Sequence, residues 1–244
     1  LERAVGMDAI LPCHTESFDA DAMAQLPKSV KIIANHSVGV DHCDLQACKA
    51  HGVVVTNTPD VLSDATAEIA MLLMLGAARR ASEGDRMMRA GTWDFWSPAF
   101  MVGTQTTAKR FGIIGMGRVG QVAAKRARGF DMEVHYFNRS RLPAELEQDA
   151  IYHASLEELL ANSDVLSSHC PASPESTNLI NAERIALLPD GAIVINTARG
   201  ALIDEQALID ALKSGKLAAA GLDVFKHEPG GNPAFAELDN IFML

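Results

Sequence analysis

Short apolar runs rich in β-branched residues alternate along the chain with helical patterns, and this alternation constrains the fold most. The apolar runs occupy residues 8–11, 31–35, 53–56, 111–114, 133–137, 165–168, 192–196, 219–223 and 241–244. The helical patterns between most of them occupy residues 44–51, 118–130, 155–161, 182–187 and 204–214. Alternation at this spacing indicates βαβ units and parallel sheets covered on both faces by helices. We therefore predict an α/β protein with doubly wound parallel sheets.

A longer helical pattern, residues 63–80, does not fit this short alternation. It is apolar over most of its circumference, so it must be buried against other protein. We interpret it as a domain linker or a subunit interface, and place the domain boundary at Pro59. Residues 1–59 then form a first domain, and residues 60–244 form a larger domain that begins with the linker or dimer helix.

The charge balance excludes two classes of partner. The sequence has 31 acidic and 21 basic residues and a net charge of −10. Non-specific binding to nucleic acids or anionic membranes needs clustered basic charge, so we expect neither partner. The longest apolar run, residues 69–78, is half of the roughly 20 residues that a membrane span needs.

The cysteines predict neither a disulfide scaffold nor a metal site. The chain has four cysteines, Cys13, Cys43, Cys48 and Cys170, which are scattered along the sequence. Cys43, Cys48 and His51 form a tempting cluster, but it lacks the fourth ligand that a structural zinc ion needs. We interpret the cysteines as ordinary thiols of a reducing compartment and expect a cytoplasmic protein without a metal.

Residues 110–120 read RFGIIGMGRVG, an apolar strand followed by glycines in G-x-G-x-x-G spacing and then a helical stretch. This context makes the motif a dinucleotide-binding fingerprint. Gly115 permits the tight turn, Gly117 lets the backbone approach the pyrophosphate, and Gly120 lets the helix pack on the strand. A purely structural glycine turn is the alternative. The expected cofactor contacts are Gly115, Gly117, Arg118, Val119 and Gly120.

The end of the next strand indicates which cofactor is preferred. NAD-binding proteins commonly place Asp or Glu there to accept the ribose hydroxyls. This sequence instead has Asn138, Arg139, Ser140 and Arg141. Guanidinium groups are suited to a 2′-phosphate, so we predict contacts from Asn138, Arg139 and Ser140 and a preference for NADP(H), with NAD(H) possible. The alternative is an exposed basic turn that tolerates either cofactor.

Motifs along the whole chain carry a family resemblance. They are NHSVGVD at 35–41, NTPD at 57–60, DATAE at 64–68, GIIGMGRVG at 112–120, HCP at 169–171, NTARG at 196–200, GLDVF at 221–225 and EP at 228–229. In this order they resemble the D-isomer-specific 2-hydroxyacid dehydrogenases, most closely the glyoxylate/hydroxypyruvate reductase (glycerate dehydrogenase) branch. The resemblance implies two doubly wound domains of Rossmann or flavodoxin-like type, the first incomplete in this chain.

The resemblance also implies the catalytic and substrate-binding residues. Arg199 matches the catalytic arginine, and its guanidinium can pair with a carboxylate and polarise a keto oxygen. Glu228 matches the glutamate that orients the acid/base histidine. Ser37, Val38 and Gly39 match the loop whose backbone amides receive the substrate carboxylate. Beside the cofactor, the resemblance places Cys170, Pro171, Thr197, Ala198 and Asp223.

One departure from the family concerns its catalytic histidine. In the family this histidine opens the segment after the strand that matches residues 241–244, and the sequence given ends at Leu244. His169 comes closest in setting, but it matches a structural or cofactor-side position. We expect the histidine to lie beyond Leu244. If the chain is instead a fragment, we expect it to bind cofactor with little turnover, because general acid catalysis contributes about 10²–10⁴-fold to the reaction rate.

The resemblance implies an enzyme that reduces a small 2-keto acid, glyoxylate or hydroxypyruvate, to the D-2-hydroxy acid with NADPH, and a homodimer. Two alternatives remain open. One is a non-enzymatic NAD(P)H sensor similar to the C-terminal-binding corepressors. The other is a sibling dehydrogenase for phosphoglycerate, D-lactate or another acid; a phosphorylated substrate would need extra basic residues, whereas the first domain offers only His36 and His42.

Overall fold

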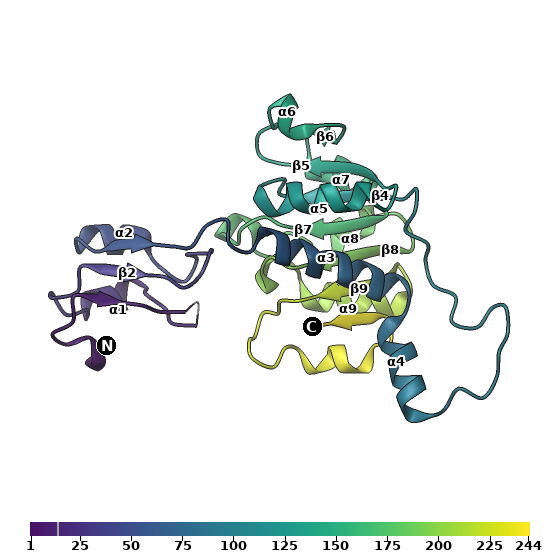
Figure 1. The fold of residues 1–244 in the computed structure, drawn as a ribbon, viewed down its shortest axis with the longest axis horizontal. Coiled ribbons are helices and arrows are strands. Elements are labelled where there is room, and N and C mark those ends of the chain that lie inside the picture. The colour runs from purple at the N-terminus through teal and green to yellow at the C-terminus, as the bar shows by residue number, and fades with distance from the viewer. Residues whose placement is uncertain (14) are drawn as a thin grey trace. The chain divides into compact units, whose positions relative to one another are not determined.

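The chain folds into two compact units. The computed structural model describes residues 1–13 and 15–244. Unit 1 spans Leu1–Leu62 and unit 2 spans Ser63–Leu244 (Figure 1). Both units contain a parallel sheet with helices packed against it, so the predicted α/β class is confirmed.

Unit 1 holds a small parallel sheet. Its strands lie in the order β1 (Ala9–Ile10), β2 (Ile32–Ala34) and β3 (Val54–Thr56). Its helical segments are η1 (Glu2–Ala4), α1 (Ala20–Ala24) and α2 (Leu45–Ala50). Cys43 and Cys48 lie in the core of this unit, and burial raises the pKa of both thiols. In the part of the chain that the structure describes, no group of three or more potential ligands could hold a metal ion.

Unit 2 is built on a seven-stranded sheet whose paired strands are all parallel. The strands are β4 (Arg110–Ile114), β5 (Glu133–Phe137), β6 (Ile151–His153), β7 (Val165–Ser168), β8 (Ala192–Asn196), β9 (Leu217–Leu222) and β10 (Ile241–Met243). Their spatial order is β10-β9-β8-β7-β4-β5-β6. The chain therefore leaves β4 toward one edge and returns at β7 toward the other, which makes a topological switch point between β4 and β7.

Helices cover both faces of this sheet. The helices of unit 2 are α3 (Ser63–Ala78), α4 (Ala81–Ala90), α5 (Arg118–Arg128), α6 (Ala144–Glu147), α7 (Leu156–Ala161), α8 (Ala182–Leu187) and α9 (Glu205–Ser214). Three 3₁₀ segments are η2 (Pro174–Ser176), η3 (Gly200–Leu202) and η4 (Pro233–Glu237). One apolar core includes residues of α3 and α5, and the second includes residues of α7, α8 and α9. Among the described residues, no helix combines the length and apolar character needed to cross a membrane.

The long helix predicted over 63–80 ends earlier than expected. Helix α3 stops at Ala78, and Arg80 adopts φ 55° before α4 begins at Ala81. Helix α3 packs on α5, β8 and β9 of its own unit, so its apolar surface is buried without a partner (Figure 1). Only part of its circumference is exposed, as at Leu72.

Among the α-helices and β-strands, four were absent from the sequence prediction: α1, α4, α6 and β6. Helix α4 is mostly polar and has no buried residue, so no run of apolar residues marks it in the sequence. Strand β6 is a three-residue edge strand, and α1 and α6 have five and four residues. Segments this short or this polar carry too few periodic positions to be recognised.

Candidate active site

The turn between β4 and α5 is built around three glycines. Gly115 has φ 92°, and a Cβ there would lie 2.7 Å from the backbone N of Cys170. A Cβ at Gly120 would lie 2.4 Å from the carbonyl oxygen of Gly115, so α5 packs directly on the turn. Above Gly117 there is room, because no described heavy atom lies within 4 Å of its Cβ position.

The same turn fits the pyrophosphate of a dinucleotide. Gly117 is the N-cap of the eleven-residue helix α5 and makes no side-chain capping bond, so the amino end of the helix faces this space. The space above Gly117 would admit the phosphates, and the helix dipole favours negative charge there.

The loop after β5 is pinned at both ends. Asn138 Oδ1 accepts a hydrogen bond from the backbone N of Met116 at 2.7 Å, which ties the loop to the glycine turn. At the other end, the backbone N of Leu142 donates to the hydroxyl of Tyr136 at 3.1 Å. Arg139 and Ser140 lie between these two anchors and are exposed to solvent.

Arg141 is engaged within the protein rather than offered to a ligand. Its Nε and Nη2 donate to the two carboxylate oxygens of Glu147 at 2.7 and 2.9 Å. Glu147 also accepts a hydrogen bond from the hydroxyl of Tyr136, and the Arg141 guanidinium lies 5.6 Å from the ring centroid of Tyr152. The Arg141 guanidinium, followed by Tyr136, holds the pKa of Glu147 below its usual range. Both guanidinium groups expected for a 2′-phosphate are exposed, but Glu147 already engages two of the donors of Arg141.

Two groups with shifted pKa values follow β7. Burial lowers the pKa of His169 to about 4, so its imidazole is neutral near pH 7. Its Nε2 lies 2.9 Å from the hydroxyl of Ser167, and its Nδ1 lies 3.5 Å from the hydroxyl of Thr197. Burial also raises the pKa of Cys170 to about 11. Both groups are uncharged, and His169 does not have the pKa of a general acid that works near neutrality.

The loop after β8 presents Arg199. Asn196, which is buried, accepts a hydrogen bond from the backbone N of Ala198 at 3.0 Å and donates to the carbonyl oxygen of Arg199 at 2.8 Å. Arg199 is half-buried, and its Nη1 donates to the carbonyl oxygen of Ala198 at 2.7 Å. The buried amide of Asn196 thus shapes the backbone that carries the guanidinium.

The loop after β9 lies directly against the arginine loop. A Cβ at Gly200 would lie 2.0 Å from the carbonyl carbon of Phe225, so the two backbones are in close contact. The backbone N of Asp223 donates to the carbonyl oxygen of Asn196 at 3.0 Å. Glu228 Oε1 accepts a hydrogen bond from the backbone N of Phe225 at 2.7 Å. Burial, followed by the negative charge of Glu228, raises the pKa of Asp223, so these two carboxylates are neighbours.

In unit 1, the predicted carboxylate loop has a distinctive hydrogen-bond pattern. The carbonyl oxygens of Ser37, Val38 and Gly39 all accept hydrogen bonds from donors within the unit. Among the described residues, the backbone N–H groups of the same three residues donate to no acceptor. Amides in this state can bind an anion.

The predicted site residues thus gather in two places. Those from the glycine turn and from the loops after β5, β7, β8 and β9 meet at the carboxyl ends of the strands of unit 2. The carboxylate loop belongs to unit 1. Three residues that organise these loops were not predicted: Asn57, Glu147 and Asn196. Asn57 and Asn196 lie within the NTPD and NTARG motifs, but all three residues bond to backbone or to another protein side chain, and none was assigned a role in ligand binding.

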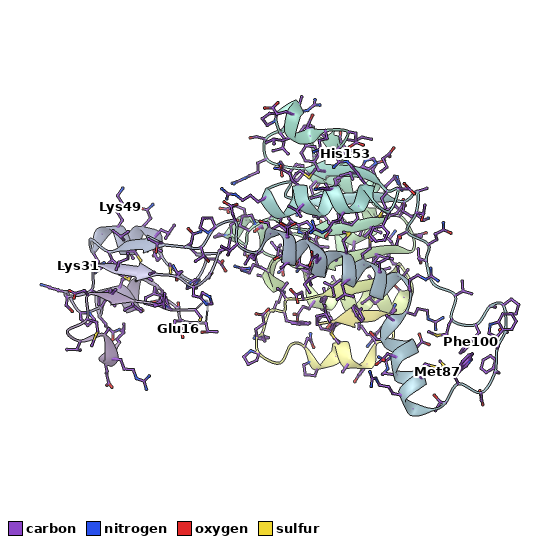
Figure 2. All side chains as sticks on the ribbon, in the orientation of Figure 1. Glu16, Lys31, Lys49, Met87, Phe100 and His153 are labelled. Atoms are coloured by element: carbon purple, nitrogen blue, oxygen red, sulfur yellow. The ribbon has the colours of Figure 1, made fainter. Side chains whose placement is uncertain are left out.

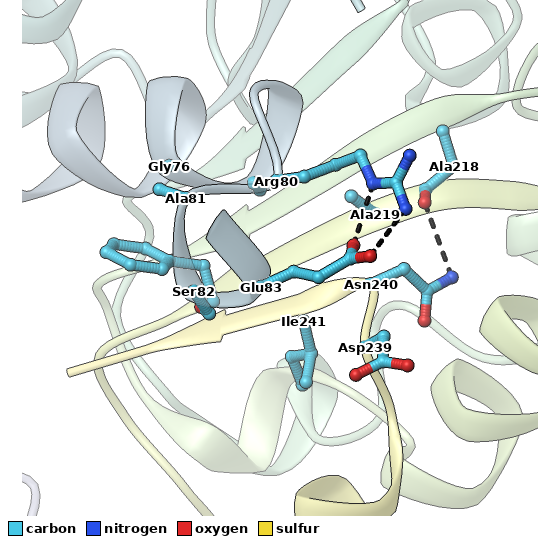
Figure 3. A pocket seen from close by; sticks show the side chains of 12 residues that line it. Gly76, Arg80, Ala81, Ser82, Glu83, Ala218, Ala219, Asp239, Asn240 and Ile241 are labelled. Atoms are coloured by element: carbon cyan, nitrogen blue, oxygen red, sulfur yellow. Dashed lines mark hydrogen bonds and ion pairs between the residues drawn. The ribbon is translucent and has the colours of Figure 1, made fainter. Parts of the chain in front are cut away.

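A pocket of about 220 Å³ lies elsewhere in unit 2 (Figure 3). It is lined by the α3–α4 junction and by residues near the amino ends of β9 and β10, including Ala218 and Ile241. Arg80 and Glu83 form a bidentate ion pair on its wall at 2.7 and 2.8 Å. Because ligands of open α/β sheets bind at the carboxyl ends of the strands, this pocket is separate from the candidate active site.

Comparisons with known proteins identify the family of the chain. A family model described as the D-isomer specific 2-hydroxyacid dehydrogenase NAD-binding domain matches residues 71–244, and the model for the catalytic domain of the same family matches residues 1–129. The chain belongs to the D-isomer specific 2-hydroxyacid dehydrogenase family. It is therefore an NAD(P)-dependent oxidoreductase that acts on a small 2-keto or 2-hydroxy acid.

Individual relatives of this dehydrogenase support the same assignment. Glycerate dehydrogenase from Hyphomicrobium methylovorum is 44% identical over 100% of this chain and 76% of the relative. Glyoxylate reductase from Thermococcus litoralis is 41% identical over 100% of this chain and 74% of the relative. The crystal structure of a glyoxylate reductase from Paecilomyes thermophila covers 97% of this chain and 73% of that chain, with a TM-score of 0.91 and 39% identity. The predictions of family, fold class and enzyme are confirmed.

Proposed function

We propose that this dehydrogenase reduces glyoxylate or hydroxypyruvate to the D-2-hydroxy acid and prefers NADPH to NADH. The loop after β5 carries this proposal. Asn138 stands where NAD-binding enzymes commonly have a carboxylate, and the exposed Arg139 and Ser140 can donate to a 2′-phosphate. The names of the relatives, glycerate dehydrogenase and glyoxylate reductase, support the substrate class.

Each unit has its own part in the proposed reaction. Residues 60–244 would form the nucleotide-binding domain, and residues 1–59 part of the substrate domain. Bound at the glycine turn, a nicotinamide cofactor supplies the hydride chemistry. Further cofactor contacts would come from Cys170, Pro171, Thr197, Ala198 and Asp223.

Arg199 is proposed to bind the substrate carboxylate and polarise the keto oxygen, which stabilises negative charge as it develops there. In unit 1, the amides of Ser37, Val38 and Gly39 are proposed to receive a substrate carboxylate. Glu228, held by the backbone N of Phe225, would orient and stabilise a protonated histidine. His169 does not take that role, because burial keeps its pKa at about 4.

We also propose a homodimer, in which an exposed apolar cluster of unit 2 meets its partner. The cluster consists of Met88, Trp93, Phe95, Trp96 and Val102, on α4 and the segment that follows it. The rings of Phe95 and Phe100 are 4.5 Å apart, and Figure 2 shows Phe100 and Met87 in this region. Large exposed apolar patches of this kind mark protein interfaces.

A cytoplasmic location agrees with the state of the cysteines. Cys13, Cys43, Cys48 and Cys170 are all free thiols. Free thiols are typical of a reducing compartment, so we place the enzyme in the cytoplasm.

Titration of NADPH and NADH with Arg139→Ala and Arg141→Ala tests the cofactor preference. A hydrogen bond to a charged group contributes about 1.5–3 kcal/mol, so Arg139→Ala should weaken NADPH binding about 10- to 150-fold and leave NADH binding unchanged. Arg141→Ala is the matched control and should retain most of the preference, because Glu147 already holds that guanidinium.

An unchanged NADPH-to-NADH affinity ratio in Arg139→Ala would refute the phosphate contact.

Initial rates with hydroxypyruvate, glyoxylate, pyruvate and phosphohydroxypyruvate test the substrate. A higher kcat/KM for either of the last two would favour a sibling dehydrogenase instead.

A further inference from the structure

Three internal donors fix the carbonyl groups of the loop 37–39. The backbone N of Thr58 donates to the carbonyl oxygen of Ser37 at 3.0 Å. Asn57 Nδ2 donates to the carbonyl oxygen of Val38 at 2.9 Å. The hydroxyl of Ser37 donates to the carbonyl oxygen of Gly39. Two of these three donors are side chains, and each bonds to backbone.

These bonds decide where the loop amides point. The peptide bonds here are trans, so the N–H of each peptide points away from its C=O. When Asn57 holds the carbonyl of Val38, the N–H of Gly39 is turned to the opposite side. Ser37 acts in the same way on the peptide that follows Gly39. The N–H groups of Val38 and Gly39 have no acceptor among the described residues, so the loop is preorganised for an anion.

The support for Asn57 comes from the end of the small sheet. The backbone N of Asn35 donates to the carbonyl oxygen of Thr56 at 3.0 Å, which extends the pairing of β2 and β3 beyond the strands. Asn57 follows Thr56 directly, so its amide group starts from an anchored backbone. Asn57 is itself exposed, and its replacement leaves the core of unit 1 intact.

We propose that Asn57, assisted by Ser37, is a positioning residue for substrate carboxylate binding. This inference rests on the proposed function, in which the loop amides receive the carboxylate. Asn57 acts through the peptide between Val38 and Gly39 and does not itself touch the substrate. Its loss therefore weakens binding of the acid more than it slows hydride transfer, and it leaves the nucleotide turn of unit 2 unchanged.

The test compares Asn57→Ala, Asn57→Asp and Ser37→Ala with wild type. Oxalate serves as a carboxylate probe of the enzyme–NADPH complex. One net hydrogen bond is worth about 1 kcal/mol, so Asn57→Ala should raise both the Kd of oxalate and the KM of the keto acid about fivefold, with kcat and the Kd of NADPH nearly unchanged. Asn57→Asp keeps the shape but only accepts hydrogen bonds, so it should bind oxalate more weakly than Asn57→Ala.

Gln46→Ala is the matched control, because it removes another exposed amide of unit 1 outside this loop. It should bind oxalate as wild type does. If Asn57→Asp binds oxalate as wild type does, the side chain only fills space and the proposal is wrong. The proposal would also be overturned if Asn57→Ala lowered kcat by the same factor by which it raised KM.

Amide NMR spectra of wild type separate this inference from the proposed function. If oxalate shifts neither the Val38 nor the Gly39 amide signal, the loop does not bind carboxylate and the proposed function fails at this point. If oxalate shifts both signals but Asn57→Ala and Ser37→Ala bind it as tightly as wild type, only the positioning role is refuted.

Discussion

Replacing Gly200 with alanine should separate the loop that carries Arg199 from the loop that carries Glu228. An added Cβ would lie 2.0, 2.2 and 2.4 Å from the carbonyl carbon and oxygen of Phe225 and the backbone N of Lys226. Ordinary contacts begin at 3.4 Å, so the backbones must move apart by about 1.4 Å. These are main-chain atoms, and no side-chain rotation can relieve the overlap.

The expected effect on activity follows from that displacement. Misplacing catalytic groups by about 1 Å can cost roughly 10²-fold, so kcat/KM for the keto acid should fall about 100-fold. NADPH should still bind, because the glycine turn lies on β4 and α5. Initial-rate kinetics below the Tm of the variant, together with fluorescence titration of NADPH, would measure both.

Gly84→Ala is the matched control for Gly200→Ala. Its Cβ would meet only Met101 Cε at 3.6 Å, an ordinary contact, so activity should stay at the wild-type level. Because alanine is preferred to glycine within a helix, the substitution should stabilise α4 by about 0.5–1 kcal/mol. A Gly200→Ala enzyme with near wild-type kcat/KM would refute the argument that close contact of these two loops sets the site.

Two further predictions concern His169 and the apolar cluster. The native pKa of His169, about 4, lies below its ordinary value of 6.5, so the unfolded chain binds more protons and stability falls as pH drops from 6.5 toward 4. Between pH 7 and pH 5, protonation of this group should lower the free energy of unfolding by about 2 kcal/mol. Urea unfolding should show this loss in wild type but not in His169→Gln. In sedimentation experiments, wild type and the control Leu187→Asp should be dimers, and Trp96→Asp should be a monomer. A monomeric wild type would contradict the proposed interface.

The fold was predictable from sequence where strands are buried on both faces. Strands β5, β7 and β8 begin and end at the predicted residues, and all of their residues except Glu133 and Phe137 are buried. The glycine turn was also predictable, since Gly115 and Gly120 stand where a Cβ would overlap backbone atoms. Helix α4 could not be predicted, because none of its residues is buried.

The packing of α3 shows a different limit of prediction from sequence. Its apolar character indicated burial correctly but did not indicate against what. The structure buries this surface on β8, β9 and α5 of the same unit, whereas sequence alone left a linker and a subunit interface equally open. Hydrophobicity reports that a surface avoids water, and carries no information about which neighbour covers it.

Sequence motifs identify residues with ligand chemistry, but the structure shows that other residues decide which of them are available. Arg139 and Arg141 have the same side chain and lie two positions apart. Glu147 accepts two hydrogen bonds from Arg141, and its Oε1 also accepts one from the hydroxyl of Tyr136. This contact depends on the path of the loop into α6, an element that the sequence did not predict. The number of arginines in a cofactor loop is therefore a poor measure of 2′-phosphate affinity, because a buried carboxylate nearby can withdraw one of them.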